Sequence, residues 1–249
     1  MDALRLGLPL GIEACLFDLD GVLTQTARLH AAAWKEMFDA FLAERSTRTC
    51  EPFVPFDPEV DYGEYIDGKL RYDGVRAFLA SRGIRLSEGA PSDPADANTI
   101  HGLGARKDEL VLAMLRNEAI ATYDGSVRYV RAARDAGLRR AVVSASKHTR
   151  ELLDAAGIAD LFEVRIDGVV AEQQHLRGKP APDTFLAAAR ALEVDAAQAA
   201  VFEDSLAGVE AGRAGGFGFV VGVDRVGHAA GLRAKGADIV VGDLAELLE

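Results

Sequence analysis

The chain is poor in cysteine and in basic residues, and it has no long apolar run. It contains 2 cysteines in 249 residues, which gives no sign of a disulfide framework. Lys and Arg number 28 against 39 Asp and Glu, for a net charge of −11; this disfavours nucleic acid as a partner, because phosphate backbones are bound by clustered basic side chains. No apolar run approaches the roughly 18 residues of a membrane span, and no signal peptide is visible. We therefore expect a cytoplasmic protein without a nucleic-acid or membrane partner.

The pattern of apolar residues predicts an α/β fold with an insertion. From Tyr123 onward, short apolar strands alternate with helices, which is typical of a doubly wound, Rossmann-like parallel sheet. One more apolar run, Ala14–Phe17, lies near the N-terminus, where Cys15 is expected to pack as a small apolar side chain. The intervening chain reads as helices over about 26–44, 73–81 and 105–118, joined by long loops at 44–66 and 85–104. We predict a core domain at residues 1–25 and 122–249, interrupted by a helical cap domain at 26–121.

Two carboxylates directly follow the first predicted strand. Asp18 comes after the apolar run, Asp20 stands two residues later, and Gly21 permits a tight backbone. Ligands of open α/β sheets bind outside the carboxyl ends of the strands. The segment is therefore a candidate for chemistry, although Asp-x-Asp-Gly on its own is equally typical of an ordinary turn.

Polar residues also follow three later predicted strands or loops. Ser144 ends a strand and begins the segment Ser144-Ala145-Ser146-Lys147, in which either serine could simply cap the next helix. Lys179 lies between a glycine and a Pro-x-Pro sequence, which stiffens the backbone around it. Glu203 and Asp204 end a buried strand, where a divalent cation would relieve their mutual repulsion, although Asp204 could also be a helix cap.

Together, these groups indicate a phosphoryl-transfer site. Carboxylates are the ligands that Mg²⁺ prefers. A metal, a lysine and a serine suit a phosphoryl group, and they explain how an acidic protein can bind one. Four unrelated turns and caps at the same sheet edge are a much poorer explanation.

These motifs, in this order, resemble those of the haloacid dehalogenase superfamily over essentially the whole chain. The resemblance implies that Asp18 is a nucleophile that becomes phosphorylated and that Asp20 is the general acid and base. It implies that Mg²⁺ is held by Asp18, the main-chain carbonyl of Asp20, and Asp204, with help from Glu203. The implied phosphate-binding residues are Ser144, Ala145, Ser146, Lys147 and Lys179.

Within the superfamily, the motifs are most similar to the β-phosphoglucomutase branch, whose members isomerise a sugar phosphate. That resemblance implies substrate or cap roles for Thr26, His30 and Arg71, although His30 could be a packed core histidine and Arg71 a surface arginine. Gln25 departs from the pattern, since many relatives carry an acid there. A small-molecule sugar phosphate is the expected partner of a monomeric enzyme. A sugar-phosphate phosphatase and a non-catalytic binding module on the same scaffold remain alternatives.

Overall fold

The computed structural model describes residues 3–117 and 119–248, which form two compact units. The sheet unit comprises Met1–Gln25, Gly68–Leu70 and Ile120–Glu249, and the helical unit comprises Thr26–Asp67 and Arg71–Ala119. Residues 1–2 and 249 of the expected core, and residue 118 of the expected cap, lie outside the described residues. Residues 68–70, expected in the cap, group with the sheet unit, where Gly68 lies against the side chain of Ser205 and Leu70 against Gly178.

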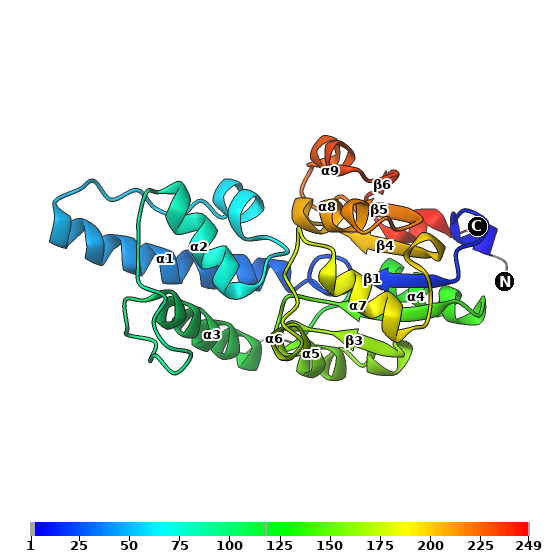
Figure 1. The fold of residues 1–249 in the computed structure, drawn as a ribbon, viewed down its shortest axis with the longest axis horizontal. Helices are drawn as coiled ribbons and strands as arrows, with labels where there is room; N and C mark the ends of the chain where they lie inside the picture. Colours follow the sequence, from blue (N-terminus) through cyan, green and yellow to red (C-terminus); the bar gives the residue numbers. More distant parts are fainter. Residues whose placement is uncertain (1–2, 118, 249) are drawn as a thin grey trace. The chain divides into compact units, whose positions relative to one another are not determined.

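Six parallel strands form one sheet in the order β3-β2-β1-β4-β5-β6 (Figure 1). This is the doubly wound order predicted from the alternation of helices and strands, which confirms the fold class. The central strand β1 ends at Phe17, which pairs with Val142 of β2 and Phe202 of β4. The strands are β1 Ala14–Phe17, β2 Arg139–Val143, β3 Val164–Ile166, β4 Ala199–Glu203, β5 Phe219–Val223 and β6 Ile239–Val241.

Alternate residues of the buried strands face opposite layers of helices. Leu16 belongs to a core cluster with Phe185 of the helix α7, whereas Phe17 stacks on Phe202 at 4.5 Å between ring centroids and meets Tyr129 of the helix α4 edge-on. Every residue of β1 and β4 is buried, as expected for central strands of a parallel sheet. The helices of the sheet unit are α4 Asp124–Asp135, α5 Thr149–Ala155, α6 Gly168–Gln173, α7 Asp183–Ala191, α8 Leu206–Ala214 and α9 Ala229–Lys235.

The helical unit has its own aromatic core. The predicted apolar face of its first helix is confirmed, because Trp34, Met37, Phe38, Phe41 and Leu42 are all buried. Phe38 lies 4.2 Å from Phe78 between ring centroids. The elements are α1 Ala27–Thr49, a π-helical turn Tyr62–Ile66, α2 Arg71–Ser81 and α3 Ile100–Asn117.

In the part of the chain that the structure describes, no helix is both long and apolar enough to cross a bilayer.

The two loops expected at 44–66 and 85–104 are shorter than the sequence suggested. The first helix continues to Thr49 and ends at Cys50, whose left-handed backbone donates its N–H to the carbonyl of Ser46. The third helix begins at Ile100 rather than near residue 105, because Thr99 accepts a hydrogen bond from the Gly102 amide. These helix ends depend on single turn and cap contacts, which apolar periodicity does not reveal.

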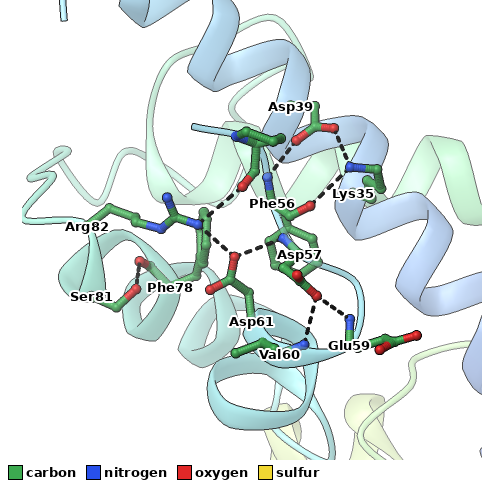
Figure 2. Close-up of polar contacts among 11 residues, drawn as sticks. Lys35, Asp39, Phe56, Asp57, Glu59, Val60, Asp61, Phe78, Ser81 and Arg82 are labelled. Carbon is green, nitrogen blue, oxygen red and sulfur yellow. Dashed lines mark hydrogen bonds and ion pairs between the residues drawn. The ribbon is translucent and has the colours of Figure 1, made fainter. Parts of the chain in front are cut away.

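A polar network ties the remaining loop to the helices of this unit (Figure 2). Asp39 of α1 accepts hydrogen bonds from the Phe56 amide at 2.7 Å and from Lys35 Nζ at 2.8 Å. Arg82, which follows α2, donates to Asp61 at 2.7 Å, and Asp61 also accepts from the amide of residue 57. The loop that carries Phe56 into the aromatic core is therefore held at both of its ends.

Replacing Asp39 tests this anchoring. Asp39→Ala leaves the Phe56 amide without its acceptor, so we expect a loss of about 1–2 kcal/mol in the free energy of unfolding. Hydrogen exchange measured by mass spectrometry should become faster in peptides that cover residues 52–60. Asp73→Ala, which removes an exposed partner of Arg76, is the matched control and should leave exchange in this loop unchanged. Equal exchange in wild type and Asp39→Ala would contradict the anchoring.

Candidate active site

The predicted polar segments meet at the carboxyl edge of the sheet, within the sheet unit. Asp18 follows β1, Ser144 follows β2, and β4 ends at Glu203 with Asp204 next. Because β1 lies between β2 and β4 and all three are parallel, the strand ends bring these side chains to one place. Lys179 comes from the loop before α7, and its ammonium reaches the same edge.

Lys179 forms the centre of a buried ion-pair cluster. Its Nζ donates to Asp18 Oδ1 at 2.5 Å and forms a second, very short ion pair with Glu203. The ammonium also lies 5.0 Å from the centroid of the Phe185 ring. The three charged residues are at most 5% exposed. Such a buried cluster fixes the position of each carboxylate, since neither can leave the ammonium without leaving it partly unpaired.

Burial and charge act in opposite directions on the titration of this cluster. Burial raises the pKa of Asp18 well above its usual range; Lys179 opposes that effect, and the negative charges of Glu203 and Asp20 reinforce it. Burial alone would lower the pKa of Lys179, but Asp18 and Glu203 outweigh it and the pKa is raised. The partners of Lys179 thus favour its charged form, whereas the position of Asp18 disfavours the charged form of its carboxyl group.

The backbone after Asp18 closes into a tight turn. The Asp18 amide donates to the carbonyl of Phe202 at 2.9 Å, and the Gly21 amide donates to the carbonyl of Thr24 at 2.8 Å. Gly21 has φ +91°, and a Cβ built on it would lie 1.7 Å from Asp204 Oδ2. Glycine is required here both for the left-handed backbone and for the space that the Asp204 carboxylate occupies.

Ser144 contacts the second aspartate of the motif. Its Oγ donates to Asp20 Oδ2 at 3.3 Å and accepts from the Ser146 amide at 3.1 Å. Neither serine is the N-cap of the next helix, because α5 begins at Thr149 with His148 as its N-cap. Ser146 Oγ accepts from the His148 amide, one residue before α5. Ser144 Oγ contacts Asp20 and the Ser146 amide instead, so the capping interpretation does not describe Ser144. The side chain of Lys147 forms an ion pair with Glu172 of α6 at 2.6 Å.

Three of the carboxylates fit a divalent cation. Asp18, Glu203 and Asp204 each offer an oxygen, and these oxygens lie within 4.8 Å of one another. Glu203 is engaged on both sides, since one oxygen pairs with Lys179 and the other accepts from the amide and hydroxyl of Ser205 at 3.1 and 2.9 Å. Asp18 and Asp204 are therefore the better ligands, and Glu203 is better placed to hold Lys179. Clustered carboxylate oxygens are the donor set that Mg²⁺ takes.

The predicted cap residues lie in the helical unit. Thr26 and His30 are buried near the start of α1, and Arg71 at the start of α2 forms a short ion pair with Asp108. His30 Nδ1 lies 2.8 Å from the Nζ of Lys107. His30 is packed in the interior, as its alternative interpretation expected. Arg71 is not a surface arginine, because its side chain is 13% exposed and pairs with Asp108.

Sequence reasoning missed Lys107. It lies on α3 at helical spacing from Leu103 and Val111, both of which are buried, and its ammonium is 5.2 Å from the ring centroid of Trp34. The sequence did contain a signal for Lys107, because a lysine stands there at a position where the apolar stripe of the helix predicts an apolar residue.

Replacing Asp18 tests the effect of burial on its charge. Because its pKa is raised, this carboxyl stabilises the fold below its unfolded pKa of about 4 and loses that contribution as the pH rises through the folded pKa. Asp18→Asn carries no charge and leaves Lys179 paired with Glu203. In chelator at pH 7.5 we expect Asp18→Asn to have a higher Tm than wild type, with a difference that shrinks as the pH approaches 4.

Asp183→Asn is the control for this experiment. A hydrogen bond from the exposed Arg177 is the main cause that lowers the pKa of Asp183, so this carboxyl stabilises the fold above its unfolded pKa. Asp183→Asn should lower Tm slightly at pH 7.5. A fall in the Tm of Asp18→Asn under the same conditions would show that pairing with Lys179 outweighs burial.

Comparison with known proteins places this geometry in a family. Residues 12–216 match the model of the haloacid dehalogenase-like hydrolases. The chain is 56% identical over 246 residues to a β-phosphoglucomutase of Mycobacterium bovis. These residues cover 98% of this chain and 94% of that protein. It is 29% identical to a β-phosphoglucomutase of Bacillus subtilis, over 95% and 92% of the two chains. A β-phosphoglucomutase structure from Clostridium difficile superposes with a TM-score of 0.73 at 24% identity, over 95% and 93% of the two chains. The chain belongs to the haloacid dehalogenase-like hydrolase family.

Proposed function

We propose that the chain is a Mg²⁺-dependent β-phosphoglucomutase that converts β-glucose 1-phosphate to glucose 6-phosphate. The observation that carries the proposal is the buried Asp18 carboxylate, held on one oxygen by Lys179 at 2.5 Å and followed by Asp20 on a closed turn. The name of the relative at 56% identity supports the choice of sugar phosphate. The activity of that relative is the reason for preferring a mutase to the other reactions of the family.

In the proposed reaction, Asp18 is the nucleophile. One of its carboxylate oxygens forms a bond to phosphorus while the bond from phosphorus to the sugar oxygen breaks, which leaves an aspartyl phosphate. Asp20 gives its proton to the departing sugar oxygen. When the donor is the 1,6-bisphosphate, the sugar released in this half is glucose 6-phosphate. In the second half, the 6-hydroxyl of β-glucose 1-phosphate attacks phosphorus, Asp20 takes the proton of that hydroxyl, the Asp18 carboxylate is released, and the 1,6-bisphosphate forms again. The contact between Ser144 Oγ and Asp20 Oδ2 supports a fixed position for this acid and base.

Charge in the site favours a bound cation. The carboxylates of Asp18 and Glu203 pair with the ammonium of Lys179, and those of Asp20 and Asp204 lie at the same sheet edge. An anionic phosphoryl group would be repelled by this excess of negative charge. Asp18, Asp204 and the main-chain carbonyl of Asp20, with Glu203 beside them, would hold Mg²⁺. When bound, the ion would supply positive charge that offsets the repulsion between the Asp18 carboxylate and an anionic phosphoryl group.

The phosphate oxygens are assigned to the segment after β2 and to Lys179. Ser144, Ala145, Ser146 and Lys147 follow one strand end, and the buried Lys179 already lies against Asp18. Lys179 stabilises the negative charge that spreads over the phosphoryl oxygens during transfer. The exposed ion pair of Lys147 with Glu172 is weak, so this ammonium can exchange its partner for a phosphate.

The sheet unit is the proposed catalytic core, and the helical unit is the proposed cap that selects the sugar. Thr26, His30 and Arg71 are its proposed substrate residues, and Lys107 joins them because it contacts His30. Arg71 binds the phosphate that is not being transferred, once it releases Asp108. The proposed location is the cytoplasm, which two free cysteines support, and the proposed state is a monomer.

Product analysis tests the proposed reaction. The protein is incubated with Mg²⁺, β-glucose 1-phosphate and a trace of the 1,6-bisphosphate, and both glucose 6-phosphate and inorganic phosphate are measured. Glucose 6-phosphate as the main product supports the mutase. Free glucose with inorganic phosphate would support a sugar-phosphate phosphatase instead, which the family also contains. Binding without any product would favour the non-catalytic module.

Replacing the two aspartates tests their separate roles. Asp18→Asn removes the nucleophile, and we expect no measurable turnover. Asp20→Asn keeps the nucleophile but removes the proton donor, so we expect kcat to fall by about 10²- to 10⁴-fold. Asp183→Asn lies on α7 outside the site and should keep the wild-type kcat. Normal turnover by Asp18→Asn would exclude the aspartyl-phosphate mechanism.

A further inference from the structure

Arg225, in the loop after β5, uses every N–H donor of its guanidinium group. Nε donates to the carbonyl of Gly21 at 3.0 Å, and one terminal nitrogen donates to the carbonyl of Gly242 at 2.7 Å and to Asp243 at 3.1 Å. The other terminal nitrogen reaches the carbonyl of Val22 at 3.5 Å and Ser126 Oγ at 3.2 Å. A guanidinium group has five N–H donors in a rigid plane. All five are therefore directed at neighbouring segments.

The position of this guanidinium is itself fixed. Its central carbon lies 3.6 Å from the centroid of the Tyr123 ring, and the side chain is 13% exposed. The neighbouring Asp224 carboxylate accepts from the amides of residues 226–229. The Asp224 side chain therefore fixes the backbone of the loop that carries Arg225.

The segment that Arg225 holds is the turn after the nucleophile. The Gly21 amide is bound by the carbonyl of Thr24 and the Gly21 carbonyl by Arg225, so this residue is fixed on both sides. Gly21 directly follows Asp20, and its Cα lies against the carboxylate of Asp204. A rotation of this one residue would therefore move both the proposed acid and a proposed metal ligand.

We infer that Arg225 is a positioning residue for phosphoryl transfer, which fixes Asp20 through the backbone of Gly21 and Val22. The inference rests on the proposed role of Asp20 as acid and base. Displacement of a reacting group by about 1 Å can lower a rate by about 100-fold. Arg225 itself touches neither the nucleophile nor its ammonium partner, so its effect on the reaction is transmitted by the turn.

The chain offers a matched control in Arg140 of β2. Its side chain is 12% exposed, and it donates to the carbonyls of Leu138 and Leu161. It is thus an equally buried arginine that binds main-chain carbonyls, at the amino end of a strand rather than at the carboxyl edge. Arg140→Met and Arg225→Met should lose comparable stability, while only the second disturbs the turn.

The test compares Arg225→Met, Arg225→Lys and Arg140→Met with wild type, in Mg²⁺ and well below each Tm. Hydrogen exchange in peptides covering residues 18–25 should become faster in Arg225→Met and stay unchanged in Arg140→Met.

We expect kcat for β-glucose 1-phosphate to fall by about 10- to 100-fold in Arg225→Met with little change in KM. The first-turnover release of 4-nitrophenol from 4-nitrophenyl phosphate should fall by less than about 3-fold, because this leaving group does not need the proton of Asp20 and water has not yet attacked the aspartyl phosphate. Arg225→Lys should recover part of the loss.

The outcomes separate this inference from the proposed function. Unchanged exchange in 18–25 overturns the inference whatever the enzyme does, and so does an equal loss in the kcat for the sugar phosphate and in the first-turnover release of 4-nitrophenol. If Arg225→Met does not fold, Arg225→Lys is measured in its place, and wild-type exchange and kinetics in that variant overturn the inference. If wild type makes no glucose 6-phosphate, the mutase is wrong, yet exchange still tests the turn, and phenyl phosphate replaces the sugar phosphate as the ester with the poor leaving group.

Discussion

The ion pairs of one buried ammonium determine how the site is built. Lys179 must lie between Asp18 and Glu203, because a charge that is at most 5% exposed is unstable without partners. That requirement brings together the ends of β1 and β4 and the loop before α7, which are separated by up to 185 residues in the sequence. Glu203 is further held by Ser205, the N-cap of α8. A helix cap, two strands and a loop are therefore linked through one nitrogen atom.

Burying the charged form of Asp18 costs folding free energy. The position of Asp18 disfavours its negative charge, because burial removes water from the carboxylate and Glu203 and Asp20 add like charge. The apolar side chains packed on both faces of β1 stabilise the fold and offset this cost in folding free energy. Gly21 contributes in a different way, since the absence of a side chain leaves the space that the Asp204 carboxylate fills.

The sequence was most informative where chemistry directly adjoins a buried strand. Asp18, Ser144 and the Glu203–Asp204 pair could be located because each follows an apolar run, and the doubly wound order predicted that these strand ends would meet. Arg225 could not be found in this way, because its contact with Gly21 joins residues 204 positions apart in a loop without periodicity. The short helix α6 was missed for a similar reason: it depends on the Asp167 side chain, which accepts from two amides of its first turn. The structure gives the positions of the residues at the strand ends, and their chemical roles, like those of Thr26, His30 and Arg71, remain predictions.

The place of β1 in the sheet has a consequence for how the chain matures. This strand is made first, but its two neighbours are β2 and β4, which begin at residues 139 and 199. At about 5–20 residues per second, an emerging chain carries an unpaired Ala-Cys-Leu-Phe segment for roughly ten seconds or more before the second edge can form. The helical unit, encoded between β1 and β2 and equipped with its own aromatic core, is complete well before that. Asp18 is therefore synthesised early, and the ion-pair cluster around it is assembled among the last steps.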